Sequence, residues 1–268
     1  MPVEFFCEVG SNHNGSFSRA CSLIQEAKML GFTGVKFQYF KAEKLWNREK
    51  FPKEYEAAEA NELPYAWLDS LSDQATDMGM LFGVSVFDTV GLEEVWRYCD
   101  YLKIASFEAG HLDLVREAYK KGLRLQISLG QTNRKEIQEV ISNFPPQENQ
   151  IDLLHCVSKY PCPLEELNLG IIQSTRMING YSDHSTFIAA VYTAVAFGAK
   201  VIELHLDLED RKGIESAHSW SNGNLIMHMR QVVSEMELSI GSGNWDAVAA
   251  EQDRTYKANR VTGRRGDE

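Results

Sequence analysis

The sequence predicts an α/β fold, a single-domain (β/α)8 barrel of the TIM barrel type. Short apolar, strand-like runs alternate eight times with longer amphipathic, helix-like runs along the 268 residues. This alternation with short connections favours a parallel sheet, and eight such units in about 250 residues match the usual size of a barrel. No linker rich in Pro, Gly or Ser interrupts the pattern. We therefore expect a barrel domain over residues 1–245 and a tail over residues 246–268.

The strands are predicted from short apolar, β-prone runs. They fall at residues 3–9, 34–37, 80–86, 101–105, 124–128, 151–157, 178–181 and 200–206. The helices are predicted from apolar residues at helical spacing, such as Leu23, Ile24 and Ala27. They fall at residues 19–30, 65–78, 90–98, 112–121, 134–143, 164–174, 185–197 and 224–240. The polar stretch 39–63 is predicted to be a long loop, which in a barrel is usually a lid or binding loop.

The turn after the first strand argues against the main alternative fold. A doubly wound sheet usually carries a phosphate-binding G-x-G-x-x-G turn at this place. The sequence here is Gly-Ser-Asn-His-Asn-Gly over residues 10–15, which does not fit that pattern. The barrel is therefore preferred.

Composition excludes several classes of protein. The chain has 27 basic and 38 acidic residues, a net charge of −11, which argues against nonspecific binding to nucleic acid. No apolar run approaches the ~18 residues that a membrane helix needs. No secretory signal precedes the first strand, and the five cysteines form no C-x-x-C pair. A reduced, cytoplasmic protein is expected.

Polar side chains follow almost every predicted strand, and the carboxyl ends of barrel strands are where reactive groups gather. A barrel without a functional site would need few polar or charged side chains at these strand ends. The residues are Glu8, Lys36, Gln38, Ser85, Lys103, Ser106, Glu108, Ser128, Ser158, Ser182, Asp183, His184, Glu203 and His205.

Two lysines, Lys36 and Lys103, lie within apolar strands. A buried lysine is costly without an anionic partner. Together with Ser106, Ser128 and Ser182 they would form a cage for a small phosphorylated acid, because lysines supply charge and hydroxyls donate hydrogen bonds. Alternatively, each lysine could pair with a carboxylate inside the barrel mouth.

Two histidines, His184 and His205, end adjacent predicted strands. Neutral imidazole binds borderline divalent metals, whereas a single histidine is more often a core residue. The nearby carboxylates Glu8, Glu203 and Asp207 favour the interpretation as a metal site.

Glu108 follows the fourth strand, a few residues after Lys103. It is a candidate general acid or base. An equally weighted alternative is that it caps the helix that begins near His111.

Six ordered motifs across residues 3–220 resemble the sialic acid synthase (N-acetylneuraminate synthase) family. They correspond to the family patterns E-[IV]-G-x-N-H-x-G, V-K-F-Q, K-I-[AG]-S-x-[DE], L-H-C-x-x-x-Y-P, G-x-S-D-H-[ST] and G-A-x-[VI]-[IV]-E-x-H. In this sequence they occupy residues 8–15, 35–38, 103–108, 154–161, 180–185 and 198–205.

The resemblance implies an enzyme that condenses phosphoenolpyruvate with an open-chain N-acetylated amino sugar of the N-acetylmannosamine type. The products would be a sialic-acid-like 3-deoxy-2-ulosonic acid and phosphate. His184 and His205 would bind Mn²⁺ or Mg²⁺, and Glu8, Glu108 and Lys103 would form the catalytic set. The implied substrate-binding residues are Lys36, Gln38, Ser85, Ser106, Ser128, Ser158, Ser182, Asp183 and Glu215, with Asp183 also fixing the adjacent histidine.

Three departures from the family pattern leave the acceptor sugar open. We expect no antifreeze-like domain after the barrel. In the family that domain reaches the active site of the partner subunit and contacts the acceptor sugar. The sequence therefore does not decide whether this protein forms the usual homodimer. Glu215 stands where an aspartate is usual, and Leu129 replaces a usual threonine. The alternatives are another metal-dependent barrel aldolase or isomerase, and a non-catalytic sugar-binding barrel.

Overall fold

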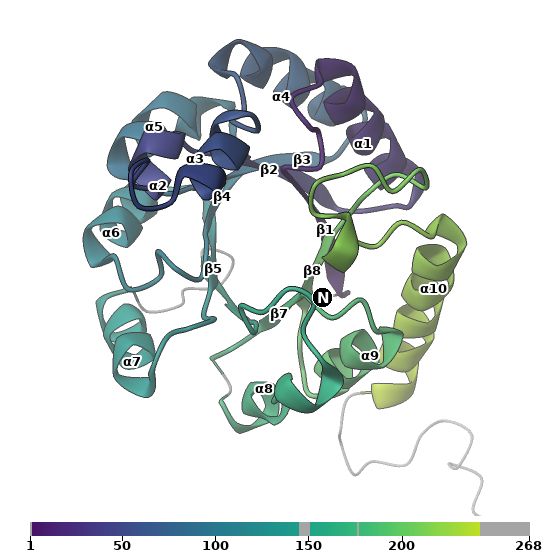
Figure 1. Cartoon of the computed structure of the whole chain (residues 1–268). Helices are drawn as coiled ribbons and strands as arrows, with labels where there is room; N and C mark the ends of the chain where they lie inside the picture. The colour runs from purple at the N-terminus through teal and green to yellow at the C-terminus, as the bar shows by residue number, and fades with distance from the viewer. Residues whose placement is uncertain (1, 145–150, 176, 242–268) are drawn as a thin grey trace, which may run out of the picture.

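Eight parallel strands close into a barrel in the order in which they occur in the chain, and helices surround it (Figure 1). This computed structural model describes residues 2–144, 151–175 and 177–241. Strand β1 pairs with β2 on one side and with β8 on the other, which closes the sheet. The strands are β1 (Glu4–Gly10), β2 (Gly34–Tyr39), β3 (Leu81–Val86), β4 (Tyr101–Ile104), β5 (Arg124–Ser128), β6 (Ile151–His155), β7 (Gly180–Asp183) and β8 (Val201–His205). The predicted TIM barrel is confirmed.

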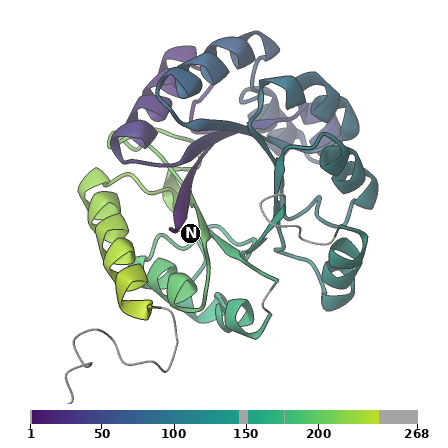
Figure 2. The same ribbon diagram turned by 180° about the vertical axis from the view of Figure 1, so that it is seen from behind.

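The outer ring consists of helices between successive strands, which both ribbon views show around the sheet (Figure 2). The α-helices are α1 (Phe17–Met29), α2 (Ala42–Leu45), α3 (Pro52–Glu59), α4 (Leu68–Asp77), α5 (Thr89–Val95), α6 (Leu112–Lys120), α7 (Arg134–Asn143), α8 (Gly170–Ser174), α9 (Ile188–Ala196) and α10 (Gly223–Ile240). Short 3₁₀ turns are η1 (Tyr65–Trp67), η2 (Trp96–Tyr98), η3 (Leu164–Glu166) and η4 (Ser216–His218). Among the described residues, no helix has the length and apolarity that crossing a membrane requires.

Two predicted elements differ from the structure. The stretch 39–63 contains the short helices α2 and α3, where a loop was predicted; Pro52 occupies the first turn of α3, a position that proline favours. The predicted helix 164–174 is divided into η3 and α8, because Asn168 has a positive φ of 48° between them. The predicted tail 246–268 lies outside the described residues.

The interior of the barrel is closed at one level by an apolar plug. Its buried members are Phe6, Tyr101, Leu154 and Val201, from four different strands. The aromatic ring of Tyr101 fits there because Gly83 faces it without a side chain, and any Cβ at Gly83 would collide with that ring. The plug separates one end of the barrel from the polar residues at the other.

A second, larger apolar core lies between the outside of the sheet and the helices. Strand residues such as Val35 and Leu204 pack there with helix residues such as Leu23 and Val191, all of them fully buried. Because strand side chains alternate between the two faces, each strand supplies this outer core with every second residue. The remaining positions face the barrel interior and are free to carry the polar groups of the site.

Candidate active site

The polar residues at the mouth are stacked along the strands at intervals of two. On β8, Val201 belongs to the apolar plug, whereas Glu203 and His205 line the cavity above it. Ser182 on β7 and His184, the residue directly after β7, line the same cavity. This spacing follows from the alternation of strand side chains, so the interior presents a plug, then a charged layer, then histidines.

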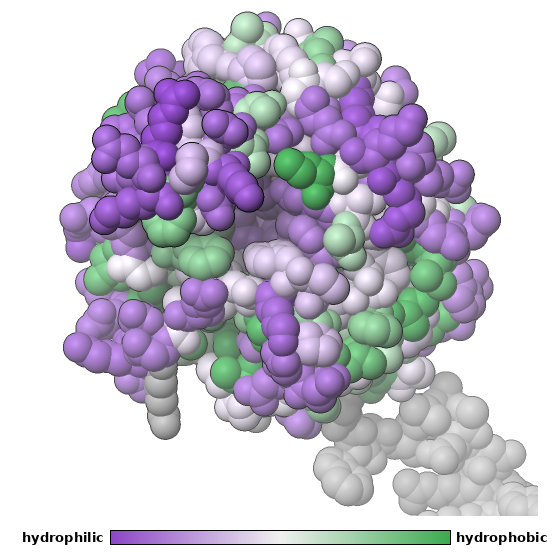
Figure 3. Space-filling view, viewed as in Figure 1, coloured by the Kyte–Doolittle hydropathy of each residue, from purple (hydrophilic) through white to green (hydrophobic). Residues whose placement is uncertain are grey.

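One small cavity of about 60 Å³ opens at this end of the barrel. In Figure 3 the same face is hollowed near its centre, and the floor of the hollow is hydrophilic. Ten of the predicted site residues line the cavity together: Glu8, Lys36, Gln38, Ser85, Lys103, Ser106, Ser128, Ser182, His184 and His205. The cavity is also lined by Ala105, Tyr160 and Glu203.

Glu203 is the centre of the charged layer. Its two carboxylate oxygens accept hydrogen bonds from Lys103 Nζ at 2.9 and 2.8 Å, and one of them also accepts from Ser182 Oγ at 2.7 Å. Lys36 Nζ lies 3.6 Å from the same carboxylate. Although burial opposes ionisation, Lys103 and Lys36 hold the pKa of the Glu203 carboxyl well below its usual range.

Lys36 is the second cation of this layer. It pairs with Glu8 and donates to Ser85 Oγ at 2.9 Å. Burial lowers the pKa of Lys36 to about 8, and the neighbouring Lys103 adds to this shift while Glu203 opposes it. Both lysines thus have carboxylate partners, as one of the alternatives predicted. A small anion entering the cavity would meet two preorganised ammonium groups.

The histidine pair lies above the charged layer. The ring centroids of His184 and His205 are 5.2 Å apart. His184 donates its Nδ1–H to the carbonyl oxygen of Val157 at 2.7 Å, which leaves Nε2 as the nitrogen with the lone pair, 3.4 Å from Ser182 Oγ. Burial, together with the neighbouring His205, lowers the pKa of His184 to about 3, so the ring is neutral at physiological pH. A neutral ring of this kind is suited to a metal.

Glu215 reaches the histidines from the loop after β8. One carboxylate oxygen accepts from the backbone N–H of Ser11 at 2.9 Å, and the other accepts from His205 Nδ1 at 3.0 Å. The carboxylate lies against Gly10, where any Cβ would collide with it and where φ is +55°. Glu215 therefore orients His205, which sequence reasoning did not foresee.

Asp183 does not lie in the cavity, and the predicted contact with the His184 ring is wrong. Its buried carboxylate accepts from the Tyr181 hydroxyl at 2.8 Å, the Ser185 hydroxyl at 2.6 Å and the Trp220 indole N–H at 2.9 Å. These bonds use up the acceptor capacity that a substrate would need. His184 is oriented instead by the Val157 carbonyl.

Ser158 lies beside the cavity-lining residues. A Cβ built on Gly130 would lie 2.5 Å from Ser158 Oγ, 2.7 Å from Cys156 Sγ and 2.8 Å from Ser106 Oγ, so the three side chains surround this glycine. The buried Ser158 hydroxyl has no hydrogen-bond partner among the described residues. It remains available to a ligand.

Glu108 is a half-buried carboxyl without a compensating partner. Its Oε2 atom has no hydrogen-bond partner in the described part of the chain, and burial raises its pKa to about 7. The alternative role as a helix cap is wrong, since α6 begins at Leu112 without any side-chain cap bond. A carboxyl with a pKa near neutrality is suited to proton transfer.

The raised pKa predicts that Glu108 destabilises the fold at high pH. Ionisation is easier in the unfolded chain, so stability is lost as the pH rises from the ordinary value of 4.5 through about 7. Glu108→Gln should therefore raise the free energy of unfolding by about 2–3 kcal/mol at pH 8 and by nothing measurable at pH 4. Urea unfolding at both pH values measures this. The exposed control Glu49→Gln should show no such pH dependence, and an equal gain at both pH values would contradict the assignment.

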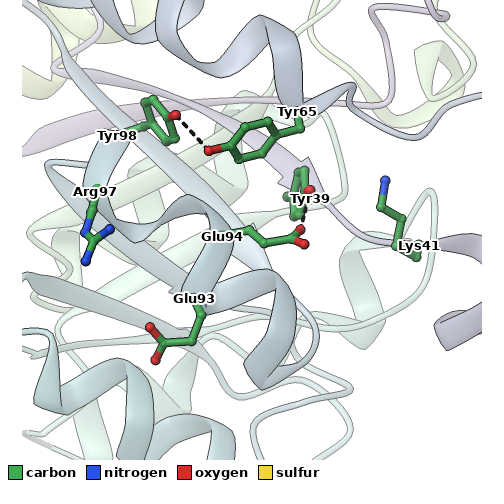
Figure 4. Close-up of a pocket in the computed structure, with 7 residues that line it drawn as sticks. All are labelled: Tyr39, Lys41, Tyr65, Glu93, Glu94, Arg97 and Tyr98. Atoms are coloured by element: carbon green, nitrogen blue, oxygen red, sulfur yellow. Dashed lines mark hydrogen bonds between the residues drawn. The ribbon is translucent and has the colours of Figure 1, made fainter.

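A larger groove of about 490 Å³ lies on the outside of the barrel (Figure 4). Four of its seven lining residues are paired with each other: the Tyr39 hydroxyl donates to Glu94 at 2.5 Å, and the Tyr65 and Tyr98 hydroxyls lie 3.0 Å apart. Lys41 and Glu93 pair with Glu62 and Lys121, which do not line the groove. The residues that line this groove are Tyr39, Lys41, Tyr65, Glu93, Glu94, Arg97 and Tyr98. None of them lines the mouth cavity. The smaller cavity therefore remains the candidate active site.

Three residues of the site were not assigned their roles from the sequence. Glu203 was predicted as a carboxylate near the metal site and not as the partner of both lysines, although its place two residues before His205 puts both side chains on one strand face. The rings of Tyr160 and His184 have centroids 4.2 Å apart, and those of His218 and His205 have centroids 4.9 Å apart. Tyr160 lies in a loop and His218 ends the short turn η4, and no periodicity indicates the approach of either segment to the site.

A closed (β/α)8 barrel whose mouth holds two lysines, serine hydroxyls and two histidines is typical of a TIM-barrel enzyme. The chain matches the NeuB family over residues 23–245 and belongs to it. This is the sialic acid synthase family that the motifs resemble.

Individual relatives agree with this assignment. The chain is 31% identical to a pseudaminic acid synthase of Campylobacter jejuni, over 91% of this chain and 76% of that one. It is 30% identical to an N,N'-diacetyllegionaminic acid synthase of Legionella pneumophila, over 91% of this chain and 74% of that one. The crystal structure of an N-acetylneuraminic acid synthetase from Leptospira borgpetersenii, in complex with citrate, superposes with a TM-score of 0.89 at 28% identity, over 97% of this chain and 93% of that one.

Proposed function

We propose that this protein condenses phosphoenolpyruvate with the aldehyde of an open-chain N-acetylated amino sugar and forms a sialic-acid-like 3-deoxy-2-ulosonic acid. Membership of the NeuB family and the names of the relatives support condensation as the reaction class. The observation that carries the proposal is the buried layer of Lys36 and Lys103 beneath two histidines, because it offers anion binding and metal binding within one cavity.

The lysine layer would hold the phosphate and carboxylate of phosphoenolpyruvate. Lys36 and Lys103 supply charge, while Ser106, Ser128 and Ser182 supply hydroxyl donors around the same cavity. Since Glu8 and Glu203 already fix the two ammonium groups, little reorganisation is needed when the anion enters. The contribution of this layer is positioning and electrostatics.

A divalent ion, Mn²⁺ or Mg²⁺, would be held by His184 and His205. The donor set fits such an ion, because the Val157 carbonyl and the Glu215 carboxylate each fix the Nδ1 atom of one ring and leave its Nε2 atom as the ligand. The chemistry that the ion supplies when bound is Lewis-acid polarisation of a carbonyl oxygen. Glu8 and Gln38 line the cavity beside this pair and would contact the acceptor.

The reaction balances with one water molecule. The C3 carbon of phosphoenolpyruvate forms a bond to the aldehyde carbon, whose oxygen takes up a proton and becomes a hydroxyl. The oxygen of water adds to C2, and the bond between C2 and the bridging oxygen then breaks, so that phosphate leaves with that oxygen and C2 becomes a ketone. Glu108 would accept the proton of this water, because its pKa of about 7 allows both protonation states near neutrality. Tyr160, packed against His184, would cover the reacting carbons from above.

The acceptor is proposed only as a class. The relatives are named for pseudaminic, legionaminic and sialic acids, which share an N-acetylated sugar-acid skeleton. All five cysteines are free, which supports a cytoplasmic location for this synthesis. A homodimer, as the resemblance implies, stays a prediction.

The test is phosphate release from phosphoenolpyruvate with Mn²⁺ and a panel of N-acetylated hexosamines and their phosphates. We expect release that requires an acceptor and that EDTA abolishes. Release without any acceptor would indicate a phosphatase. Release that persists after EDTA treatment would contradict the metal requirement, and binding without turnover across the panel would favour the non-catalytic barrel.

A further inference from the structure

A third level of side chains follows the histidine pair toward the open end of the barrel. It consists of Tyr160, which lines the cavity and is 44% exposed, and of His218 at the end of η4. Their ring centroids are 4.8 Å apart, and the His218 ring lies 4.9 Å from that of His205. The His218 side chain is only 13% exposed. A substrate that reaches the histidine pair from solvent therefore passes these two rings.

The segment that carries His218 is held against the end of β8. Trp220 donates its backbone N–H to the carbonyl of His205 at 2.7 Å. On the other side of His218, the side chain of Asn12 accepts from the backbone N–H of Glu215 at 2.8 Å. Bonds on both sides of His218 therefore fix its position before any ligand arrives.

The His218 ring is polar, neutral and without a hydrogen-bond partner among the described residues. Its Nε2 atom lies 3.9 Å from Glu215 Oε2, which is beyond hydrogen-bond distance. Burial, together with the neighbouring His205, lowers the pKa of His218 to about 4. The ring therefore carries one N–H donor and one acceptor nitrogen at neutral pH. Both oxygens of Glu215, by contrast, already accept hydrogen bonds.

The place of His218 beside the histidine pair decides which part of the acceptor it meets. In the proposed reaction, the aldehyde end of the sugar lies at the pair of His184 and His205. The acetamido group of an N-acetylmannosamine-type sugar is on C2, the carbon bonded to the aldehyde carbon. Because the rings of His218 and His205 are in contact, the substituent on C2 is the part of the sugar that His218 can reach.

An acetamido group matches this place in polarity and in shape. It carries one N–H donor, one carbonyl acceptor and a methyl group. The neutral imidazole offers an acceptor and a donor, and the Tyr160 ring beside it offers an apolar face. A hydroxyl group on C2 has neither the carbonyl nor the methyl group. A site built to bond a polar group of the substrate discriminates against an analogue that lacks it.

We infer that His218 determines acceptor specificity through a hydrogen bond to the acetamido group on C2, whose methyl group packs against Tyr160. This inference rests on the proposed function and deepens it, because it names the feature of the acceptor that is recognised and the residue that recognises it. The consequence is a preference for 2-acetamido over 2-hydroxy sugars that depends on the imidazole.

The test compares N-acetylmannosamine with mannose, which differ only in the substituent on C2, as acceptors for phosphate release with phosphoenolpyruvate and Mn²⁺. His218→Phe keeps an aromatic ring and removes both nitrogens. We expect it to lower kcat/KM about tenfold for N-acetylmannosamine and less than about twofold for mannose. His218→Gln keeps a donor and an acceptor and should retain most of the preference. His228→Phe is the control, because His228 is exposed on α10.

A binding measurement without turnover keeps the inference apart from the proposed reaction. The reduced open-chain sugar 2-acetamido-2-deoxymannitol has no aldehyde and cannot react. Its affinity, measured by calorimetry, should fall about tenfold in His218→Phe, because a hydrogen bond in a desolvated place is lost. The affinity for phosphoenolpyruvate should stay unchanged in the same variant, which a general disturbance of the fold would not allow. Thermal unfolding of each variant verifies the fold.

The outcomes fall on one side or the other. An equal loss for both acceptors, or an unchanged affinity of His218→Phe for the reduced sugar, would overturn the inference while phosphate release upholds the proposed reaction. Binding of the reduced sugar that depends on His218, in a protein that releases no phosphate, would support the inference and contradict the proposed reaction. A wild-type protein that neither binds the reduced sugar nor releases phosphate would overturn both.

Discussion

Replacing Lys103 by methionine is expected to lower kcat/KM for phosphoenolpyruvate at least ~10³-fold, which is about 4 kcal/mol of transition-state stabilisation. Methionine keeps most of the aliphatic stem and removes the charge that the substrate anion would meet. The same change leaves Glu203, a buried carboxylate, without its closest cation at 2.8 Å. Breaking a buried pair on one side costs about 3–5 kcal/mol of folding free energy.

A double variant separates the two effects of this substitution. Adding Glu203→Gln to Lys103→Met removes the unpaired carboxylate, so most of the lost free energy of unfolding should return. Turnover should stay lost, because the ammonium group of Lys103 is still absent from the cavity. Urea unfolding and phosphate release measure the two quantities. Recovery of turnover in the double variant would contradict the role assigned to Lys103.

Lys120→Ala is the matched control for this experiment. Lys120 is exposed on α6 and forms only an i,i+3 pair with Glu117. Surface pairs of this kind contribute about 0–1 kcal/mol, so neither stability nor turnover should change appreciably.

Replacing His184 by alanine is expected to reduce turnover at least ~10³-fold and Mn²⁺ affinity at least ~100-fold, in line with the loss of one ligand from a site with few protein ligands. The ring also donates to the Val157 carbonyl at 2.7 Å, so about 1 kcal/mol of stability should be lost with it. His205→Ala should act in the same direction. Calorimetric Mn²⁺ titration and phosphate release measure both effects.

A histidine outside the cavity provides the control. His111 is exposed at the start of α6 and makes no side-chain cap bond. His111→Ala should keep Mn²⁺ affinity and turnover. If His184→Ala retained wild-type Mn²⁺ affinity, the proposed metal pair would be wrong.

The barrel itself could be predicted from the sequence, because it depends on local periodicity. The alternation of apolar runs located every strand, and ten predicted site residues share one cavity because carboxyl ends of parallel strands converge at one end. The interrupted helix around Asn168 could not be predicted, since a single left-handed residue leaves no periodic signal. Helices α2 and α3 were missed because short helices in a polar stretch lack an apolar face.

The parts of the site that sequence reasoning missed depend on contacts between distant segments. Glu215 bonds His205 only because the loop after β8 folds back over Gly10. Asp183 was expected to hold its neighbour in sequence, yet its acceptors are used by the Ser185 hydroxyl and the Trp220 indole. Which neighbour a buried carboxylate binds is decided by the packing of loops, and adjacency in sequence does not determine it.

In the proposed reaction, a new carbon–carbon bond forms at C3 of phosphoenolpyruvate in the cavity beneath His184 and His205. The most direct measurement is carbon NMR of the products of [3-¹³C]phosphoenolpyruvate, incubated with the protein, Mn²⁺ and the acceptor that supports phosphate release. We expect the label to appear in the C3 methylene of a 3-deoxy-2-ulosonic acid, in an amount equal to the phosphate released. Release of phosphate with all of the label in pyruvate would contradict it.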